Sequence, residues 1–307
     1  MSAGSSPAGP GRVIFSELDV HNRPETVLAY REAVERVIDE MRRRLSEELP
    51  LEELAEIACI SPFHFLRIFR SLTGLPPCQF LGALRLEKAK RLLLESDRSV
   101  TEVCLDVGYG SLGSFTSRFT QLVGLSPSRF RQLSQAGGLP SLEDLPARLF
   151  PLFQGPGGVD VTGPLEASEG LIFIGLFEHA IPQGRPLGCG IATGPGTFHL
   201  AAPGDGRFHL FALGMGWPRE AGEILSDPSP QQVGRAGPVT IRDGQVRGAT
   251  ALRMRAPDPL DPPLLLTLPL LIAEKLAALE AAERAARAAA ERRDSAAPTP
   301  ALAAAAP

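Results

Sequence analysis

The chain has 307 residues, of which 44% are apolar and 21% charged, and its formal net charge at pH 7 is −4. That composition excludes a disordered or collagen-like chain, and the length suffices for two domains with separate cores. The most apolar run, Leu264 to Ala273, is too short to span a bilayer and contains a proline. The chain also begins without a charged-then-apolar signal segment, so we expect a cytoplasmic protein that does not bind membranes.

Cysteine and charge patterns narrow the function classes further. The four cysteines (Cys59, Cys78, Cys104 and Cys189) form no CxxC pair, so they predict neither a zinc site nor a disulfide framework. Between residues 41 and 135 there are 13 Arg and Lys against 10 Asp and Glu. This mild basic excess is by itself weak support for a nucleic-acid partner.

The first half of the chain is predicted to be helical. Residues 1–23 have the composition of a disordered tail, and Pro24 opens a helix whose apolar residues recur with a 3.6-residue period. Helical patterns continue to about residue 133, which indicates one helical domain over 24–135. Residues 136–163 are rich in Gly and Pro and are predicted to be a linker.

The pattern changes to strands beyond the linker. Over 164–271, short apolar or alternating runs are separated by Gly, Pro and Asp-Gly turns, which is typical of a small antiparallel β-sandwich. The runs that we expect to be strands are 171–177, 196–202, 207–213, 237–256 and 263–271. Residues 272–307 are predicted to form an Ala-rich helix and a disordered tail. The fold class is therefore multidomain α plus β, with an all-α domain followed by an antiparallel β-sandwich and a trailing helix.

The helical domain contains one segment twice. The stretch FRSLTGLPPCQF (Phe69–Phe80) returns as FTQLVGLSPSRF (Phe119–Phe130), with six of the twelve positions identical. Upstream of each copy a short amphipathic helix, a tight turn and a second helix lead to the shared phenylalanine, which is helix-turn-helix spacing. A long helix from Cys78 to Ser96 is expected to join the two motifs rigidly.

Each repeated residue has an expected structural role. Phenylalanines four residues apart should form the core of each motif, since they share one helix face: Phe65 and Phe69, then Phe115 and Phe119. Glycines should end each second helix in a left-handed conformation, and prolines should open the next helix: Gly74 and Pro77, then Gly124 and Pro127. In the turn, Gly108 of the second copy takes the place of Cys59 and is expected to have a positive φ.

Two such motifs, together with the VGLSPSRFR ending at Val123–Arg131, resemble the DNA-binding domain of the AraC/XylS family of transcription regulators. The resemblance covers roughly Glu40 to Leu133, under a third of the chain. It implies a sequence-specific DNA-binding transcription regulator whose two recognition helices enter successive major grooves, ~34 Å apart. Double-stranded DNA is the expected partner; RNA polymerase and a small-molecule effector of the C-terminal domain are further candidates.

The resemblance also implies which residues face DNA. The first recognition helix should begin at Ser61-Pro62 and the second near Ser111. The candidates are Phe63, His64, Leu66, Arg67 and Arg70 on the first helix, and Ser111, Leu112, Ser114, Thr116, Ser117 and Arg118 on the second. We favour Arg67 for a base edge, because Arg bidentate to guanine discriminates by ~1–3 kcal/mol.

Several of these assignments have alternatives. His64 either donates to DNA or is a half-buried helix histidine. The family often has an arginine at the place of Ser117, whereas here the arginine comes one residue later, so Arg118 is a candidate for either a base or a phosphate. Three other arginines are candidates for phosphate contacts or for a solvated face: Arg85, Arg129 and Arg131.

The C-terminal domain resembles, at low specificity, a transthyretin or carboxypeptidase-regulatory β-sandwich. His199 and His209 fall on expected strands where they could meet, yet no Asp, Glu or Cys joins them at ligand spacing, so we predict no metal and no cofactor. No phosphate loop or Ser/His/Asp order predicts an enzyme. Two alternative functions remain: an enzyme tethered to DNA with its activity in the β domain, and an oligomerisation adaptor.

Overall fold

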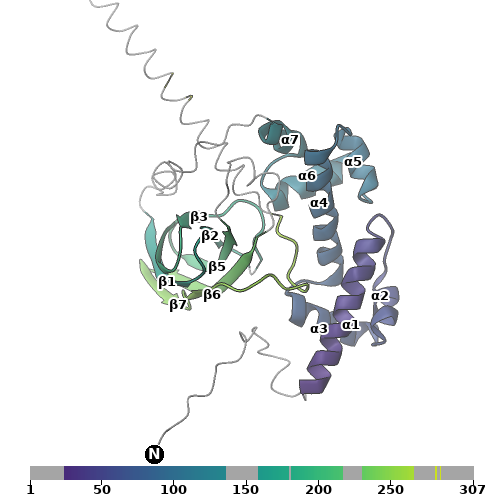
Figure 1. Ribbon diagram of the computed structural model, residues 1–307, viewed down its shortest axis with the longest axis horizontal. Helices are drawn as coiled ribbons and strands as arrows, with labels where there is room; N and C mark the ends of the chain where they lie inside the picture. The colour runs from purple at the N-terminus through teal and green to yellow at the C-terminus, as the bar shows by residue number, and fades with distance from the viewer. Residues whose placement is uncertain are drawn as a thin grey trace, which may run out of the picture.

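The computed structural model describes residues 24–135, 158–179, 181–216 and 230–265, with Ala281 and Arg284. These ranges form a helical N-terminal part and a strand-rich C-terminal part, so the predicted α plus β class is confirmed (Figure 1). The predicted N-terminal tail, the predicted linker up to residue 157 and nearly all of the predicted Ala-rich helix lie outside the described residues. Within the described ranges, no helix combines the length and apolarity needed to cross a bilayer.

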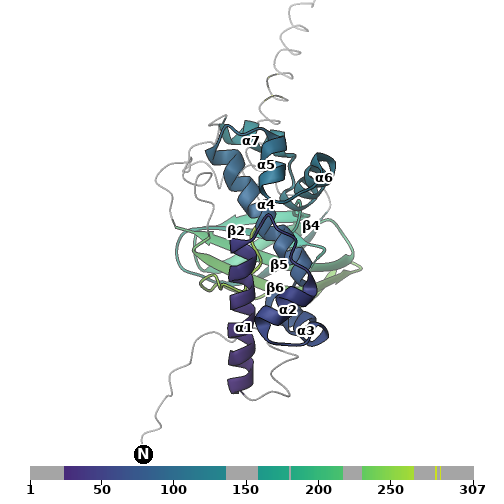
Figure 2. The same cartoon turned by 90° about the vertical axis from the view of Figure 1, so that its right-hand side faces the viewer.

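The helices of the N-terminal part are arranged as two groups around a shared central helix. They are α1 (Pro24–Arg43), α2 (Leu51–Ala58), α3 (Pro62–Thr73), α4 (Pro77–Glu95), α5 (Val100–Asp106), α6 (Leu112–Val123) and α7 (Pro127–Gln135). Helix α4 runs between the groups, with α1 to α3 at one end and α5 to α7 at the other (Figures 1 and 2). Its residues enter both cores: Leu81 and Leu84 pack in the first, and Leu86 and Leu93 in the second.

Each group is built around three phenylalanine rings whose centroids lie at similar distances. Neighbouring ring centroids lie 5.5 Å (Phe65–Phe69) and 5.4 Å (Phe69–Phe80) apart in the first group, and 5.6 Å (Phe115–Phe119) and 5.7 Å (Phe119–Phe130) apart in the second. All six side chains are fully buried. Tilted and edge-to-face pairs at these distances add to the stabilisation from burial itself. The predicted core of both motifs is therefore confirmed.

The C-terminal part consists of two sheets that enclose one apolar core. Its strands are β1 (Val159–Glu166), β2 (Leu171–Phe177), β3 (Gly188–Ala192), β4 (Gly196–Ala202), β5 (Gly206–Met215), β6 (Gln232–Arg242), β7 (Gln245–Gly248) and β8 (Leu252–Arg253). The strand orders are β4-β1-β8 and β3-β2-β5-β6-β7. The pairing is antiparallel except between β1 and β8, which are parallel.

Strand boundaries differ from the expected ones at both ends of this domain. Strand β1 begins at Val159, inside the predicted linker 136–163, where Gly and Pro concealed an alternation that buries Val161 and Leu165. Of the run 263–271, residues 263–265 lie within the described ranges, and they do not form a strand. Leu265 instead packs in the second helical core. The Asp243-Gly244 turn has φ of 51° and 72°, as a tight hairpin turn between β6 and β7 requires.

Candidate nucleic-acid interface

The turns that join α2 to α3 and α5 to α6 have the same hydrogen bonds. In the first turn the Ile60 amide donates to the Ala55 carbonyl at 3.0 Å, and in the second the Tyr109 amide donates to the Cys104 carbonyl at 3.0 Å. The two copies therefore align with an offset of 49 residues through the turn. One extra residue then precedes α6, which brings the offset to 50 at Phe115.

The left-handed position in each turn is filled differently. Gly108 has a φ of 82°, as predicted, whereas Cys59 adopts a φ of 56° at the equivalent place. Gly108 is also needed for space, because a Cβ there would lie 2.8 Å from Cα and O of Ser46 in the loop after α1. The second turn thus packs directly against the first copy, at a point where any side chain would collide with main-chain atoms.

Helix α3 separates an apolar face from an exposed one. Phe65, Ile68 and Phe69 are fully buried. On the opposite face Phe63 is 83% exposed and Leu66 37% exposed. Arg67 and Arg70 are exposed beside them. The helix ends, as expected, at Gly74, whose φ is 80°.

His64 connects α3 to α1. We call α3 and α6, the two expected recognition helices, the first and second reading helices. Its Nε2 lies 3.1 Å from Tyr30 Oη, and its Nδ1 lies 3.4 Å from Nη2 of Arg67. Since Arg67 can only donate, Nδ1 accepts, and Nε2 carries the proton toward Tyr30. His64 is half-buried. His64 is held between Tyr30 and Arg67 and orients Arg67, and its contact with DNA stays a prediction.

Helix α6 begins with a network of hydroxyl groups. Ser111 is the N-cap, and its Oγ accepts from the Ser114 amide at 3.2 Å. The two hydroxyl oxygens lie 2.8 Å apart. Leu112 is 42% exposed. A side-chain cap of this kind stabilises the helix start, so these two serines hold the helix as well as line its exposed tip.

The remaining candidates on α6 differ in exposure. Ser117 is exposed, whereas Thr116 and Arg118 are half-buried. The guanidinium of Arg118 donates to Oε1 of Gln121 at 3.1 Å on the same helix. The opposite face buries Phe115 and Phe119. Arg118 is therefore held against its own helix, while the exposed face of α6 is made mostly of hydroxyl groups.

Charge is separated between the helices of each motif. Helices α3 and α6 contain arginines and one histidine but no acidic residue. Helix α2 by contrast contains Glu52, Glu53 and Glu56 and no basic residue. A surface built by α3 and α6 is consequently positive where the neighbouring surface is negative. Such an arrangement favours a polyanion on the reading helices alone.

Two of the candidate phosphate contacts have structural partners. Arg85 on α4 donates to the carbonyls of Leu45 and Glu47, each at 2.7 Å, and so fastens the loop after α1. Arg131 on α7 donates to the carbonyls of Leu93, Ser96 and Arg98 after α4. The two arginines play the same part, one in each copy. Their hydrogen bonds to the main chain give both arginines a structural role, and their contact with phosphates stays a prediction.

The third candidate is also held by the protein. The guanidinium of Arg129 donates to Oε1 of Gln132 at 2.8 Å, and the residue is half-buried.

His199 and His209 lie in different sheets of the β domain. His199 on β4 is opposite Thr162 and lies 3.4 Å from Oδ2 of Asp160. His209 on β5 is opposite Phe177, and burial lowers its pKa, with smaller contributions from Arg207 and His179. The meeting of His199 and His209 considered from the sequence does not occur. Across the described ranges, no three His, Cys, Asp or Glu side chains gather where they could hold a metal ion.

Comparison with known proteins is consistent with this geometry. Residues 54–133 match the model of a helix-turn-helix domain family. The MmsAB operon regulatory protein of Pseudomonas aeruginosa is 40% identical over 97 residues, which are 32% of this chain and 32% of that protein. Residues 54–133 are an AraC-type helix-turn-helix domain.

Other similar proteins match a similar share of the chain. The bifunctional transcriptional activator/DNA repair enzyme AdaA of Bacillus subtilis is 29% identical over 104 residues, 34% of this chain and 49% of that protein. The crystal structure of the DNA-binding domain of AdpA in complex with a target DNA has 37% identity and a TM-score of 0.33, and the match covers 34% of this chain and 93% of that one.

These matches have a limited extent. The matched part spans 32% and 49% of the length of the two curated relatives. The family match ends at residue 133, before the first strand, so the AraC-type domain accounts for the helical part alone.

Proposed function

We propose that the protein is a sequence-specific DNA-binding transcription regulator in which α3 and α6 read successive major grooves of one duplex. The observation that carries this proposal is the equivalence of the two reading helices. Both have the same core rings and turn bonds, and they lie at opposite ends of α4 on the same side of it (Figure 2). One chain with two such helices can read a bipartite site without dimerising.

The two half-sites would be read by different chemistry. Arg67, exposed and oriented by His64, is the residue that we assign to a guanine edge in the first half-site. In the second half-site the exposed hydroxyl of Ser117 and the apolar side chain of Leu112 are suited to a base edge and to a thymine methyl group. Arg118, bonded to Gln121, is better suited to a phosphate.

We also infer that the chain acts as a regulator and not as an enzyme. The relatives matched through the AraC-type domain are mainly named as regulators, and AdaA is named as both activator and repair enzyme. RNA polymerase and an effector of the β domain are partners that we propose on the same basis. Repair of damaged DNA by the purified full chain would contradict this inference.

The proposal can be tested by selecting binding sites from random duplex DNA with the full chain. Arg67→Ala should relax the preference at one base position by ~1–3 kcal/mol. Arg118→Ala should weaken binding to all sequences alike and reduce the salt slope by about one. Arg36→Ala, at an exposed position on α1, is the control and should change neither property. An unchanged base preference in Arg67→Ala would remove Arg67 from the interface, and no enriched sequence with the unaltered chain would refute the function.

A further inference from the structure

The segment that leaves the β domain lies against both copies of the motif. This segment, which we term the strap, runs from Arg255 to Leu265. Leu260 is 4% exposed and packs in the core of the first copy, whereas Leu265 is 3% exposed and packs in the core of the second. Between these two anchors the carbonyl of Leu264 accepts from Nζ of Lys90, a buried residue of α4. The strap therefore follows α4 from one core to the other.

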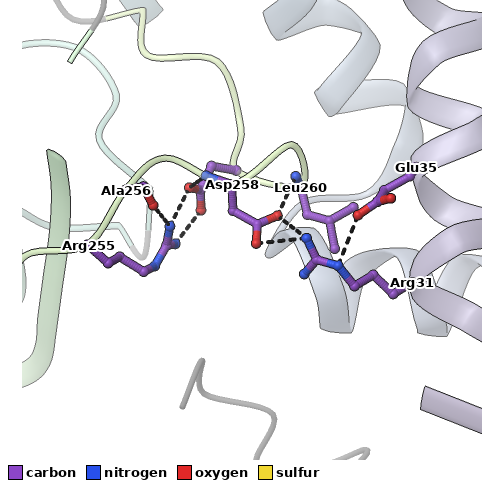
Figure 3. Close-up of polar contacts among 7 residues, drawn as sticks. Arg31, Glu35, Arg255, Ala256, Asp258 and Leu260 are labelled. Carbon is purple, nitrogen blue, oxygen red and sulfur yellow. Dashed lines mark hydrogen bonds and ion pairs between the residues drawn. The ribbon is translucent and has the colours of Figure 1, made fainter. Parts of the chain in front are cut away.

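Ion pairs fix the beginning of the strap. The guanidinium of Arg31 on α1 donates to both carboxylate oxygens of Asp258 at 2.8 Å, and it also pairs with Glu35 (Figure 3). Within the strap, Arg255 pairs with Asp261 at 2.6 Å and 2.8 Å. Arg255 and Asp261 form a bidentate pair, which sets a direction as well as a distance, whereas Arg31 reaches both oxygens of Asp258 from Nη2 alone. The strap thus enters the first copy in one defined geometry.

A second contact from the β domain reaches the end of α6. The loop between β2 and β3 donates from the Gly184 amide to the Leu122 carbonyl at 3.0 Å, and from Arg185 Nε to the Gly124 carbonyl at 3.2 Å. These carbonyls close the second reading helix. In the first copy a residue of the reading helix itself ties the helix end to the following turn, because the Thr73 hydroxyl lies 2.8 Å from the Phe69 carbonyl oxygen and 3.0 Å from the Leu75 carbonyl oxygen.

The second copy has no such hydroxyl, since Val123 stands at the place of Thr73. The β domain donates to two carbonyls at the end of α6, whereas in the first copy a side chain of α3 itself bonds at the helix end. The contact is also close: a Cβ on Gly184 would lie 2.8 Å from the Gln121 carbonyl, and Gly184 has a φ of 68°. The loop therefore follows the position of α6 closely.

We propose that the C-terminal β domain is a positioning element that fixes α6 relative to α3 and thereby sets the half-site separation that the protein accepts. The strap holds α1 and both cores, and the β2–β3 loop holds the end of α6, so movement of one copy against the other must break contacts with the β domain. The inference rests on the proposed DNA-reading function. A shift of one base pair moves a half-site by ~3.4 Å and rotates it by ~34°, which a fixed pair of helices cannot follow.

The test compares affinities of full-length variants for the selected DNA site and for sites whose half-sites are one base pair closer or farther. Gly184→Ala places a methyl group against α6. Gly244→Ala is the matched control, because Gly244 has a φ of 72° but its Cβ would meet nothing within 4 Å. Asp258→Asn removes the charge pair with Arg31 and keeps the side-chain shape. Its control is Glu166→Gln, which weakens the exposed pair with Arg253 inside the β domain.

The unaltered chain should lose affinity at both shifted sites. Gly184→Ala and Asp258→Asn should make the loss of affinity at the shifted sites roughly threefold to thirtyfold smaller, which is the size of effect that mutations along a coupling network have on coupling. The two control variants should lose as much affinity at the shifted sites as the unaltered chain. Partial unfolding would lower binding to all three sites by one factor and leave their ratio unchanged. A wild-type ratio in both variants, or equal binding of the unaltered chain to all three sites, overturns the proposal. Absence of specific binding at every site would refute the DNA-reading function itself.

Discussion

The two helix-turn-helix copies have the same core but complete their structures by different means. Ring distances and turn hydrogen bonds repeat closely between them. In the first copy Thr73 of the reading helix itself bonds the carbonyls of Phe69 and Leu75 and ties the helix end to the following turn. In the second, the turn packs against Ser46 and the reading helix ends against the β2–β3 loop. The comparison shows that the aromatic core specifies the motif, whereas the ends of its helices can be completed from outside.

The capping of the first helix also differs between the two motifs. Helix α5 begins with a capping box in which Ser99 and Glu102 bond reciprocally, while α2 follows Pro50 without a side-chain cap. Hydrogen bonds from Ser99 hold the pKa of Glu102 below its usual value. The sequence of the second copy thus contains a capping box at the start of its first helix, which the first copy lacks. The reading helix of the first copy, in turn, ends with a hydrogen bond from its own side chain.

The largest expected effect comes from removing the middle phenylalanine ring of each copy, Phe69 or Phe119. Phe69→Ala and Phe119→Ala should each lower the free energy of unfolding by about 3–5 kcal/mol, because both rings are fully buried between two others. Denaturant unfolding monitored by circular dichroism measures the loss. Phe63→Ala is the control and should leave stability unchanged, since that ring is 83% exposed. A small loss at Phe119 alone would show that the second core is loosely packed.

A second test concerns Lys90, in the half of α4 that belongs to the second copy. Burial lowers its pKa to about 8. The unfolded chain therefore binds more protons than the folded one between about pH 8 and pH 10.5, and stability contributed by this group rises across that window. Lys90→Met should add about 2–3 kcal/mol at pH 7, and the gain should vanish near pH 10.5. A gain independent of pH would mean that Lys90 is not the titrating group.

The turn position gives a test with opposite signs in the two copies. Gly108→Ala should cost about 2–4 kcal/mol, because it adds a left-handed penalty to a collision with Ser46. Cys59→Gly should stabilise the protein by about 1 kcal/mol, since it relieves a φ of 56° at an exposed residue. Thermal unfolding of the two variants checks both signs. Destabilisation by Cys59→Gly would show that the thiol makes a contact worth more than the strain.

The smallest expected effect concerns the capping box. Ser99→Ala should destabilise by about 1 kcal/mol, because it leaves the Glu102 amide without its acceptor. Ser117→Ala, an exposed position inside α6, serves as the comparison and should change stability far less. Equal effects at the two serines would indicate that the cap contributes little and that packing alone sets the start of α5.

Much of the helical domain could be predicted because its signals are local. Phenylalanines four residues apart share a face, and a glycine in left-handed conformation ends a helix, whatever surrounds them. Because the motif occurs twice, each of these signals is present at two places in the sequence. The exposed faces of α3 and α6 followed from the same periodicity. His64 was ambiguous because its partner Tyr30 lies on another helix, 34 residues away.

The arrangement of the β domain against the helices could not be predicted in the same way. Leu260 and Leu265 lie in a Pro-rich stretch, and no sequence pattern there indicates that they pack in the motif cores. Only the folded chain brings Leu260 into the first core and Leu265 into the second. Arg31 and Asp258 are separated by 227 residues. Periodicity and turn residues report on neighbours within a few positions, so they specify the elements of each copy. Contacts across such separations depend on the shapes that those elements present once packed, and these contacts join the copies to the β domain.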